Sequence, residues 1–121
     1  TDVTGFGLLG HLLEICEGSD VSAKINFEAV PKLPGIEYYL EQGCSPGGAQ
    51  RNFDSYGHKI GPMKENWQKI LCDPQTSGGL LVVVANDSCQ EFTAFTAEFG
   101  LSLQPIGSLM TRLDPPYIEV L

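Results

Sequence analysis

The first seven residues, Thr1-Asp2-Val3-Thr4-Gly5-Phe6-Gly7, place a carboxylate and two glycines directly ahead of an apolar run. Glycines that open a helix expose its first backbone N–H groups, and the helix dipole favours an anion there. A carboxylate beside a bound phosphate is readily bridged by Mg²⁺, which takes one or two protein carboxylates together with phosphate oxygens. Asp2 is therefore a candidate metal ligand, with Thr4 and Gly5 near the phosphate. The pattern leaves open that Asp2 or Thr4 only caps the helix.

The same region, Gly5-Phe6-Gly7-Leu8-Leu9-Gly10, matches the G-x-G-x-x-G spacing of dinucleotide-binding folds. That interpretation requires a strand directly before the glycines and an acidic residue about 20 positions after them. Only four residues precede Gly5, Asp20 comes too early, and Glu28 follows the next expected strand. The spacing therefore does not favour a dinucleotide site.

A second glycine-rich stretch, Pro46-Gly47-Gly48, is followed closely by Arg51 and Asn52. Glycines allow a backbone to approach a ligand closely, and a guanidinium group binds phosphate oxygens in a forked geometry. We therefore expect Gly47, Gly48, Arg51 and Asn52 to lie near a phosphate. The alternative is a solvated turn that carries an ordinary surface arginine.

A third polar segment, Asp73-Pro74-Gln75-Thr76-Ser77-Gly78-Gly79, leads directly into an apolar run. Its hydroxyls and glycines can face a ligand pocket, or they can form a tight turn needed for close packing.

Two isolated residues raise further chemical hypotheses. His11 is a candidate general base, because histidine is the residue type that most often exchanges protons near neutral pH, but its place on the polar strip of the first helix favours a structural or solvent-facing role. Glu14 lies one turn later and is placed to pair with it. Thr1 could act as the nucleophile of an autoprocessed hydrolase, although only its position supports this. No Ser–His–Asp or Cys–His set is supported by spacing.

Hydrophobic periodicity predicts the elements that position these residues. The apolar run Leu80–Val84 predicts a central strand covered on both faces, and Ser88 to Glu91 form a capping box before a helix that buries Phe92, Phe95 and Phe99. The order predicts one mixed α/β layered domain. The expected helices are 5–17, 34–42, 64–71 and one beginning at 88; the expected strands are 21–27, 79–85, 101–107 and 117–121; residues 43–62 are expected to form a loop.

Composition narrows the class of protein. The 121 residues are 42% hydrophobic and 18% charged, which is typical of a globular domain. A net charge of −8 repels phosphate backbones, so we expect no nucleic-acid partner. No apolar run approaches the roughly 20 residues that span a bilayer, so no membrane association is expected. The four cysteines lack the close spacing of a zinc site, which favours free thiols in the cytoplasm.

Taken together, residues 1–11, 46–52 and 73–81 resemble the selenophosphate synthetase (selenide, water dikinase) family, within the aminoimidazole ribonucleotide synthetase superfamily. The middle segment departs from the family at Ala49, where a Thr is usual. The resemblance implies that residues 1–121 form a single carboxy-terminal domain, a layered α/β/α unit with a mixed sheet. The intact two-domain enzyme would make selenophosphate, AMP and phosphate from ATP, selenide and water. In it, Asp2 would help to bind Mg²⁺ at the ATP phosphates.

The resemblance also implies what lies elsewhere. The family's catalytic Cys or selenocysteine, its nearby Lys, its other metal-binding aspartates and most of its ATP contacts belong to an amino-terminal domain, which also forms most of a homodimer interface. None of the four cysteines of this chain matches the catalytic position. We therefore expect the chain alone to fold, to be inactive and to hold no cofactor tightly. A second hypothesis is a stand-alone module that binds an anion or nucleotide at the amino end of the first helix.

Overall fold

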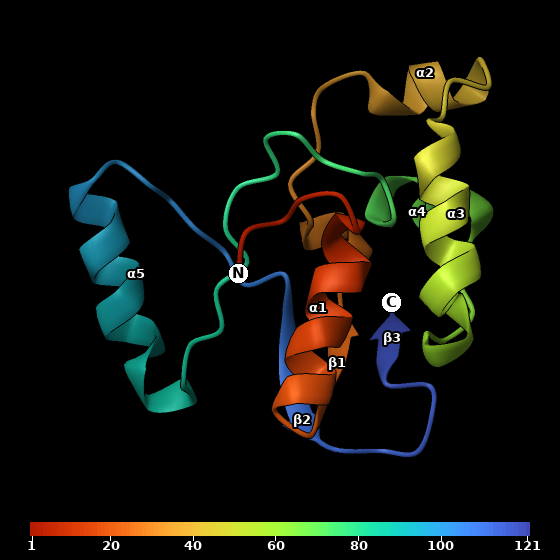
Figure 1. Cartoon of the computed structure of the whole chain (residues 1–121). Coiled ribbons are helices and arrows are strands. Elements are labelled where there is room, and N and C mark those ends of the chain that lie inside the picture. The colour runs from red at the N-terminus through yellow and green to blue at the C-terminus, as the bar shows by residue number, and fades with distance from the viewer.

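The computed structural model describes all residues from 1 to 121 and contains a small sheet with helices around it (Figure 1). None of its helices combines the length and apolar character needed to cross a bilayer. The helices are α1 (Gly7–Gly18), α2 (Ile36–Glu41), α3 (Gly47–Tyr56), α4 (Glu65–Leu71) and α5 (Cys89–Glu98); the strands are β1 (Val21–Ile25), β2 (Gly107–Thr111) and β3 (Ile118–Val120); short 3-10 turns are η1 (Phe27–Ala29), η2 (Gly57–Lys59) and η3 (Asn86–Ser88).

The three strands form one mixed sheet in the order β2-β1-β3. β1 is antiparallel to β2, with Ala23 opposite Leu109, and parallel to β3, with Ala23 opposite Ile118. In Figure 1, α1 packs against the sheet in front of β1 and β2, and α3 and α4 lie side by side next to it. The mixed α/β class expected from the sequence is confirmed.

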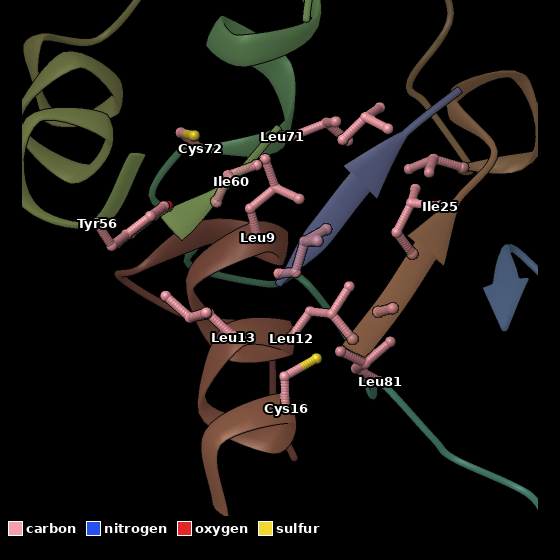
Figure 2. Close-up of a cluster of buried hydrophobic side chains, with 14 of the residues drawn as sticks. Leu9, Leu12, Leu13, Cys16, Ile25, Tyr56, Ile60, Leu71, Cys72 and Leu81 are labelled. Carbon is pink, nitrogen blue, oxygen red and sulfur yellow. The ribbon is translucent and has the colours of Figure 1, made fainter. Parts of the chain in front are cut away.

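The hydrophobic core lies between α1 and the sheet (Figure 2). Leu9, Leu12, Leu13 and Cys16 recur at three- and four-residue spacing along α1, so they share the face that meets the strands. Leu9 and Cys16 have no exposed surface at all. This packing fixes the start of α1, and with it the first segment of the chain.

The prediction of a loop over residues 43–62 is wrong, because α3 occupies ten of these positions. Gly47 and Gly48 occupy the first turn, where a glycine costs less helical stability than it does in a helix interior. Ala49 and Tyr56, seven residues apart, are both buried on the inner face of α3. Tertiary packing of this face therefore outweighs the weak helix propensity of its glycines.

The predicted central strand at 79–85 is also wrong. Its only pairing is a single bridge between Asp2 and Leu80, and no strand follows. The side chain of Leu80 is 72% exposed, and Val82 and Val83 are exposed as well. The apolar run is extended, as expected, but the three-stranded sheet does not include it.

The helix predicted after Ser88 is present as α5, although its surroundings differ from the prediction. Figure 1 shows α5 set apart from the other elements. Phe95 and Phe99 are 57% and 68% exposed and contact each other edge to face, with ring centroids 5.1 Å apart. The capping box is wrong, since no side chain caps α5 and the Ser88 hydroxyl donates to Asp87 instead.

The remaining differences concern strand boundaries. The strand predicted at 101–107 is wrong in place, because β2 begins at Gly107, where the prediction ended. The strands expected at 21–27 and 117–121 are present but shorter, as β1 and β3.

Candidate functional site

The first segment of the chain runs antiparallel to the third polar segment. The backbone N–H of Val3 donates to the carbonyl of Gly79 at 2.9 Å, and that of Leu81 donates to the carbonyl of Thr1 at 2.9 Å. The N–H of Gln75 donates to the carbonyl of Thr4 at 3.0 Å. Two of the three sequence motifs therefore lie side by side.

Glycines allow this close approach. A Cβ atom added to Gly78 would lie 2.4 Å from the carbonyl oxygen of Val3, well inside van der Waals contact. Gly7 has a φ of +71°, which side chains rarely adopt, and a Cβ there would lie 2.7 Å from the carbonyl carbon of Cys72. Both positions therefore require glycine for packing. For the third segment, which contains Gly78, this supports the alternative of a tight turn needed for close packing.

Asn52 joins the middle motif to the first motif and to Cys72, the residue directly before the third motif. Its Nδ2 donates to the carbonyl oxygen of Gly5 at 2.8 Å and to that of Cys72 at 2.9 Å. From the same helix, the Tyr56 hydroxyl donates to the carbonyl of Phe6 at 2.6 Å. Both hydrogens of the Asn52 amide are thus used inside the protein, so it positions the glycine turn.

The amino end of α3 carries the other residues expected near phosphate. A Cβ on Gly48 would lie 2.5 Å from Cγ of Pro74, which places this end directly against the third segment. No side chain caps α3, whose preceding residue is Pro46. Arg51 is exposed and forms neither an ion pair nor a side-chain hydrogen bond. An uncapped helix end and an unpaired guanidinium group both favour an anion.

Asp2 is exposed, and its carboxylate has no protein partner. Val3 is buried while Asp2 and Thr4 are exposed, which is the alternation of an extended segment and places both on its outer side. The helix-cap alternative is wrong for both residues, because Phe6 precedes α1 and no side chain accepts from the first N–H groups of α1. The Asp2 carboxylate is therefore available to a ligand.

Behind Thr4 lies a hydrogen-bonded series that sequence reasoning found only in part. Oγ1 of Thr4 lies 3.0 Å from Nε2 of His11, and Nδ1 of His11 lies 3.1 Å from Oε2 of Glu14. The expected pairing of His11 with Glu14 is present. His11 is buried, however, and its contact with Thr4 depends on how the turn at Gly5–Gly7 folds back, which spacing alone does not reveal.

Burial controls the ionisation of three groups near the three segments. Burial raises the pKa of the Cys72 thiol, and a hydrogen bond with Tyr56 partly opposes this. The pKa of Tyr56 is also raised, mainly by burial and then by Cys72. Burial likewise raises the pKa of Asp73, while a hydrogen bond from Gln75 lowers it. Cys72 is thus held as a thiol, which is a poor nucleophile.

The cysteines and acidic residues do not assemble a complete metal centre. All four cysteines are free, as expected. No cluster of three or more His, Cys, Asp or Glu side chains has the geometry to hold a metal ion. Asp2 is thus a single carboxylate, which suits Mg²⁺ only where other oxygen ligands complete the coordination.

Comparison with known proteins identifies the family. The family model described as AIR synthase related protein, C-terminal domain, matches residues 1–112. The chain belongs to this family. This chain is also similar to proteins named selenide, water dikinase, which confirms the family that the three motifs indicated. The relative from Aeromonas hydrophila subsp. hydrophila is 58% identical over 120 residues, which cover 99% of this chain and 35% of that protein.

Two more relatives carry the same name. The protein from Pseudomonas aeruginosa is 61% identical over 112 residues, covering 93% of this chain and 33% of that protein. The protein from Bordetella bronchiseptica is 57% identical over 121 residues, covering 100% of this chain and 35% of that protein. This chain thus spans about a third of the length of the relatives it matches.

Proposed function

We propose that this chain is the carboxy-terminal domain of a selenide, water dikinase, and that Asp2 supplies one carboxylate ligand for Mg²⁺ at the phosphates of ATP. The observation that carries the proposal is the convergence of the three motifs, with an unpaired carboxylate at Asp2 and an unpaired guanidinium group at Arg51. The intact enzyme would form selenophosphate, AMP and phosphate from ATP, selenide and water.

The donor set fits a shared metal site. Mg²⁺ commonly takes one or two carboxylates and completes its shell with phosphate oxygens and water. Asp2 offers one exposed carboxylate, and it belongs to no group of three or more His, Cys, Asp or Glu side chains that could hold a metal ion by themselves. When bound, the metal ion would neutralise charge on the phosphates. Residues outside this chain would then supply the remaining protein ligands and the catalytic nucleophile.

The chain's own residues would position this site. Arg51 and the uncapped N–H groups of α3 would attract phosphate oxygens, with Gly47 and Gly48 keeping the backbone accessible. Asn52 would not contact the ligand but would hold the turn at Gly5 against Cys72 through its two hydrogen bonds.

Three further proposals concern the intact protein. The intact protein would form a homodimer through residues outside this chain. It would be located in the cytoplasm. The 121-residue chain alone would lack activity. The free thiols are compatible with a reducing compartment.

The decisive test is Asp2→Asn in the intact protein that carries this chain. We expect selenophosphate formation, followed by ³¹P NMR, to fall by about 10- to 100-fold, with a higher Mg²⁺ requirement. Asp114→Asn makes the same change at an exposed aspartate without a partner and should leave activity unchanged. Wild-type activity and an unchanged Mg²⁺ dependence for Asp2→Asn would refute the metal role.

The unpaired Arg51 and the uncapped end of α3 also favour a second candidate, a stand-alone module that binds an anion or nucleotide. Titration of the 121-residue chain with Mg-ATP by calorimetry separates the two. One carboxylate and one arginine should bind weakly, so micromolar affinity would favour the self-sufficient module.

A further inference from the structure

The proposed metal and phosphate contacts leave one buried polar series unused. His11 is only 7% exposed, and its two ring nitrogens contact Thr4 on one side and Glu14 on the other. The ring of Phe6 lies 5.7 Å from the imidazole, at an angle of 53°. A buried imidazole with a partner at each nitrogen has a fixed orientation, and Thr4, at one end of the series, lies on the same outer side as Asp2.

The chemistry of the partners determines which way the hydrogens point. An ionised carboxylate only accepts hydrogen bonds, so Glu14 requires His11 to donate from Nδ1. In the neutral imidazole, Nε2 then carries a lone pair and accepts the hydrogen of the Thr4 hydroxyl. The lone pairs of Thr4 Oγ1 that remain face away from His11. Thr4 is thereby an acceptor rather than a donor toward anything bound outside.

We propose that His11 is a positioning residue which, held by Glu14, fixes the Thr4 hydroxyl as an acceptor for water molecules that hydrate a divalent cation at Asp2. The inference rests on the proposed function, since it requires the cation at Asp2. Mg²⁺ gives up its waters reluctantly and keeps several of them in protein sites. These waters donate hydrogen bonds, so an oriented acceptor on the same side of the segment as Asp2 stabilises the hydrated ion.

The first measurement is the tautomer of His11, from ¹⁵N NMR of the ring in the 121-residue chain at pH 8. We expect the neutral Nδ1–H form in the wild type. Glu14→Ala should remove this preference, because the carboxylate that accepts from Nδ1 is gone. Finding the Nε2–H form in the wild type would overturn the proposal, since Thr4 would then receive a hydrogen from His11 instead of giving one.

The second measurement is binding of Mn²⁺, used as a paramagnetic probe that broadens nearby amide signals even when it binds weakly. Thr4→Val should weaken binding by about 2- to 10-fold, the loss of one hydrogen bond, whereas Thr4→Ser should remain close to wild type. Glu14→Ala should weaken it in the same direction. Thr111→Val is a matched control at an exposed threonine whose hydroxyl makes no hydrogen bond, and it should have no effect.

The variants separate failure of this inference from failure of the proposed function. If Asp2→Asn abolishes broadening but Thr4→Val binds as tightly as the wild type, His11 has only a structural role and the inference is wrong. If Asp2→Asn leaves the broadening unchanged, or the wild type shows none near Asp2, the metal role of Asp2 fails and the inference fails with it. In both cases the tautomer measurement still reports whether Glu14 orients His11.

Discussion

Replacing Asn52 with Ala should separate the three segments that form the candidate site. The Asn52 amide donates to the carbonyl of Gly5 at 2.8 Å and to that of Cys72 at 2.9 Å, so it connects α3 with the first motif and with the residue directly before the third. The change removes both donors and leaves two carbonyl oxygens without these partners. Water can reach the exposed Gly5, but Cys72 is fully buried.

The expected cost follows from these surroundings. A typical intramolecular hydrogen bond contributes about 0.5–1.5 kcal/mol net, and a buried acceptor left without a partner costs about 1–3 kcal/mol. Loss of the bond to the exposed Gly5 carbonyl and of the bond to the buried Cys72 carbonyl together gives a cost of about 1.5–4.5 kcal/mol for Asn52→Ala. This is a large share of the roughly 5–15 kcal/mol by which a domain is stable.

The assay is urea denaturation of the 121-residue chain, followed by circular dichroism. Asn26→Ala is the matched control, because Asn26 is exposed and its side chain accepts one hydrogen bond, from the N–H of Glu28. Loss of that local cap should cost about 0.5–1 kcal/mol. If Asn52→Ala costs no more than Asn26→Ala, Asn52 does not hold the segments together and the reasoning fails.

Three further predictions use the same denaturation assay. Leu9→Ala should cost about 2–5 kcal/mol, whereas Phe95→Ala should cost less than about 1 kcal/mol because Phe95 is largely exposed; equal losses would show that α5 is packed in solution. Gly78→Ala should cost about 1–3 kcal/mol through its backbone clash, while Gly5→Ala, which meets no atom within 4 Å, should not destabilise the chain by a similar amount. Burial raises the pKa of Cys72 above its ordinary value of 9.0, so the unfolded state loses this proton first and the free energy of unfolding should fall as pH rises above about 9. Cys72→Ala should reduce that slope by at most about 1.4 kcal/mol per pH unit, and an unchanged slope would contradict the assignment.

The sequence supported predictions where local pattern and packing agree. The helix at 7–18 was predictable because its apolar residues recur at helical spacing and meet the sheet. α3 was not, because its glycines and polar residues resemble a loop. Its helical state depends on contacts of Tyr56 and Asn52 with segments distant in the chain.

The apolar run at 80–84 shows a different limit of sequence reasoning. Hydrophobicity indicates that these side chains favour burial, but it does not say which surface covers them. In this chain the run continues from the segment that pairs with Thr1–Thr4, and although Leu81 is buried in the core, Leu80, Val82 and Val83 remain exposed. The same holds for the phenylalanines at 92, 95 and 99, whose spacing predicted a buried face, although Phe95 and Phe99 are largely exposed. Both errors have one cause: the spacing of apolar residues predicts an apolar face but does not identify the element that packs against it.

The candidate site could be predicted as three separate motifs, but not as one surface. Their convergence depends on backbone pairing between residues 1–4 and 75–81 and on the Asn52 side chain. Every buried side-chain nitrogen or oxygen atom in the chain has a hydrogen-bond partner, so no polar side chain of the interior requires a ligand. The unpaired charges of Asp2 and Arg51 therefore lie at the surface, where they can accept a ligand without the large cost of uncovering a buried charge. A phosphate that carries a divalent cation offers positive charge to Asp2 and negative charge to Arg51, whereas an anion or a cation alone would satisfy only one of them.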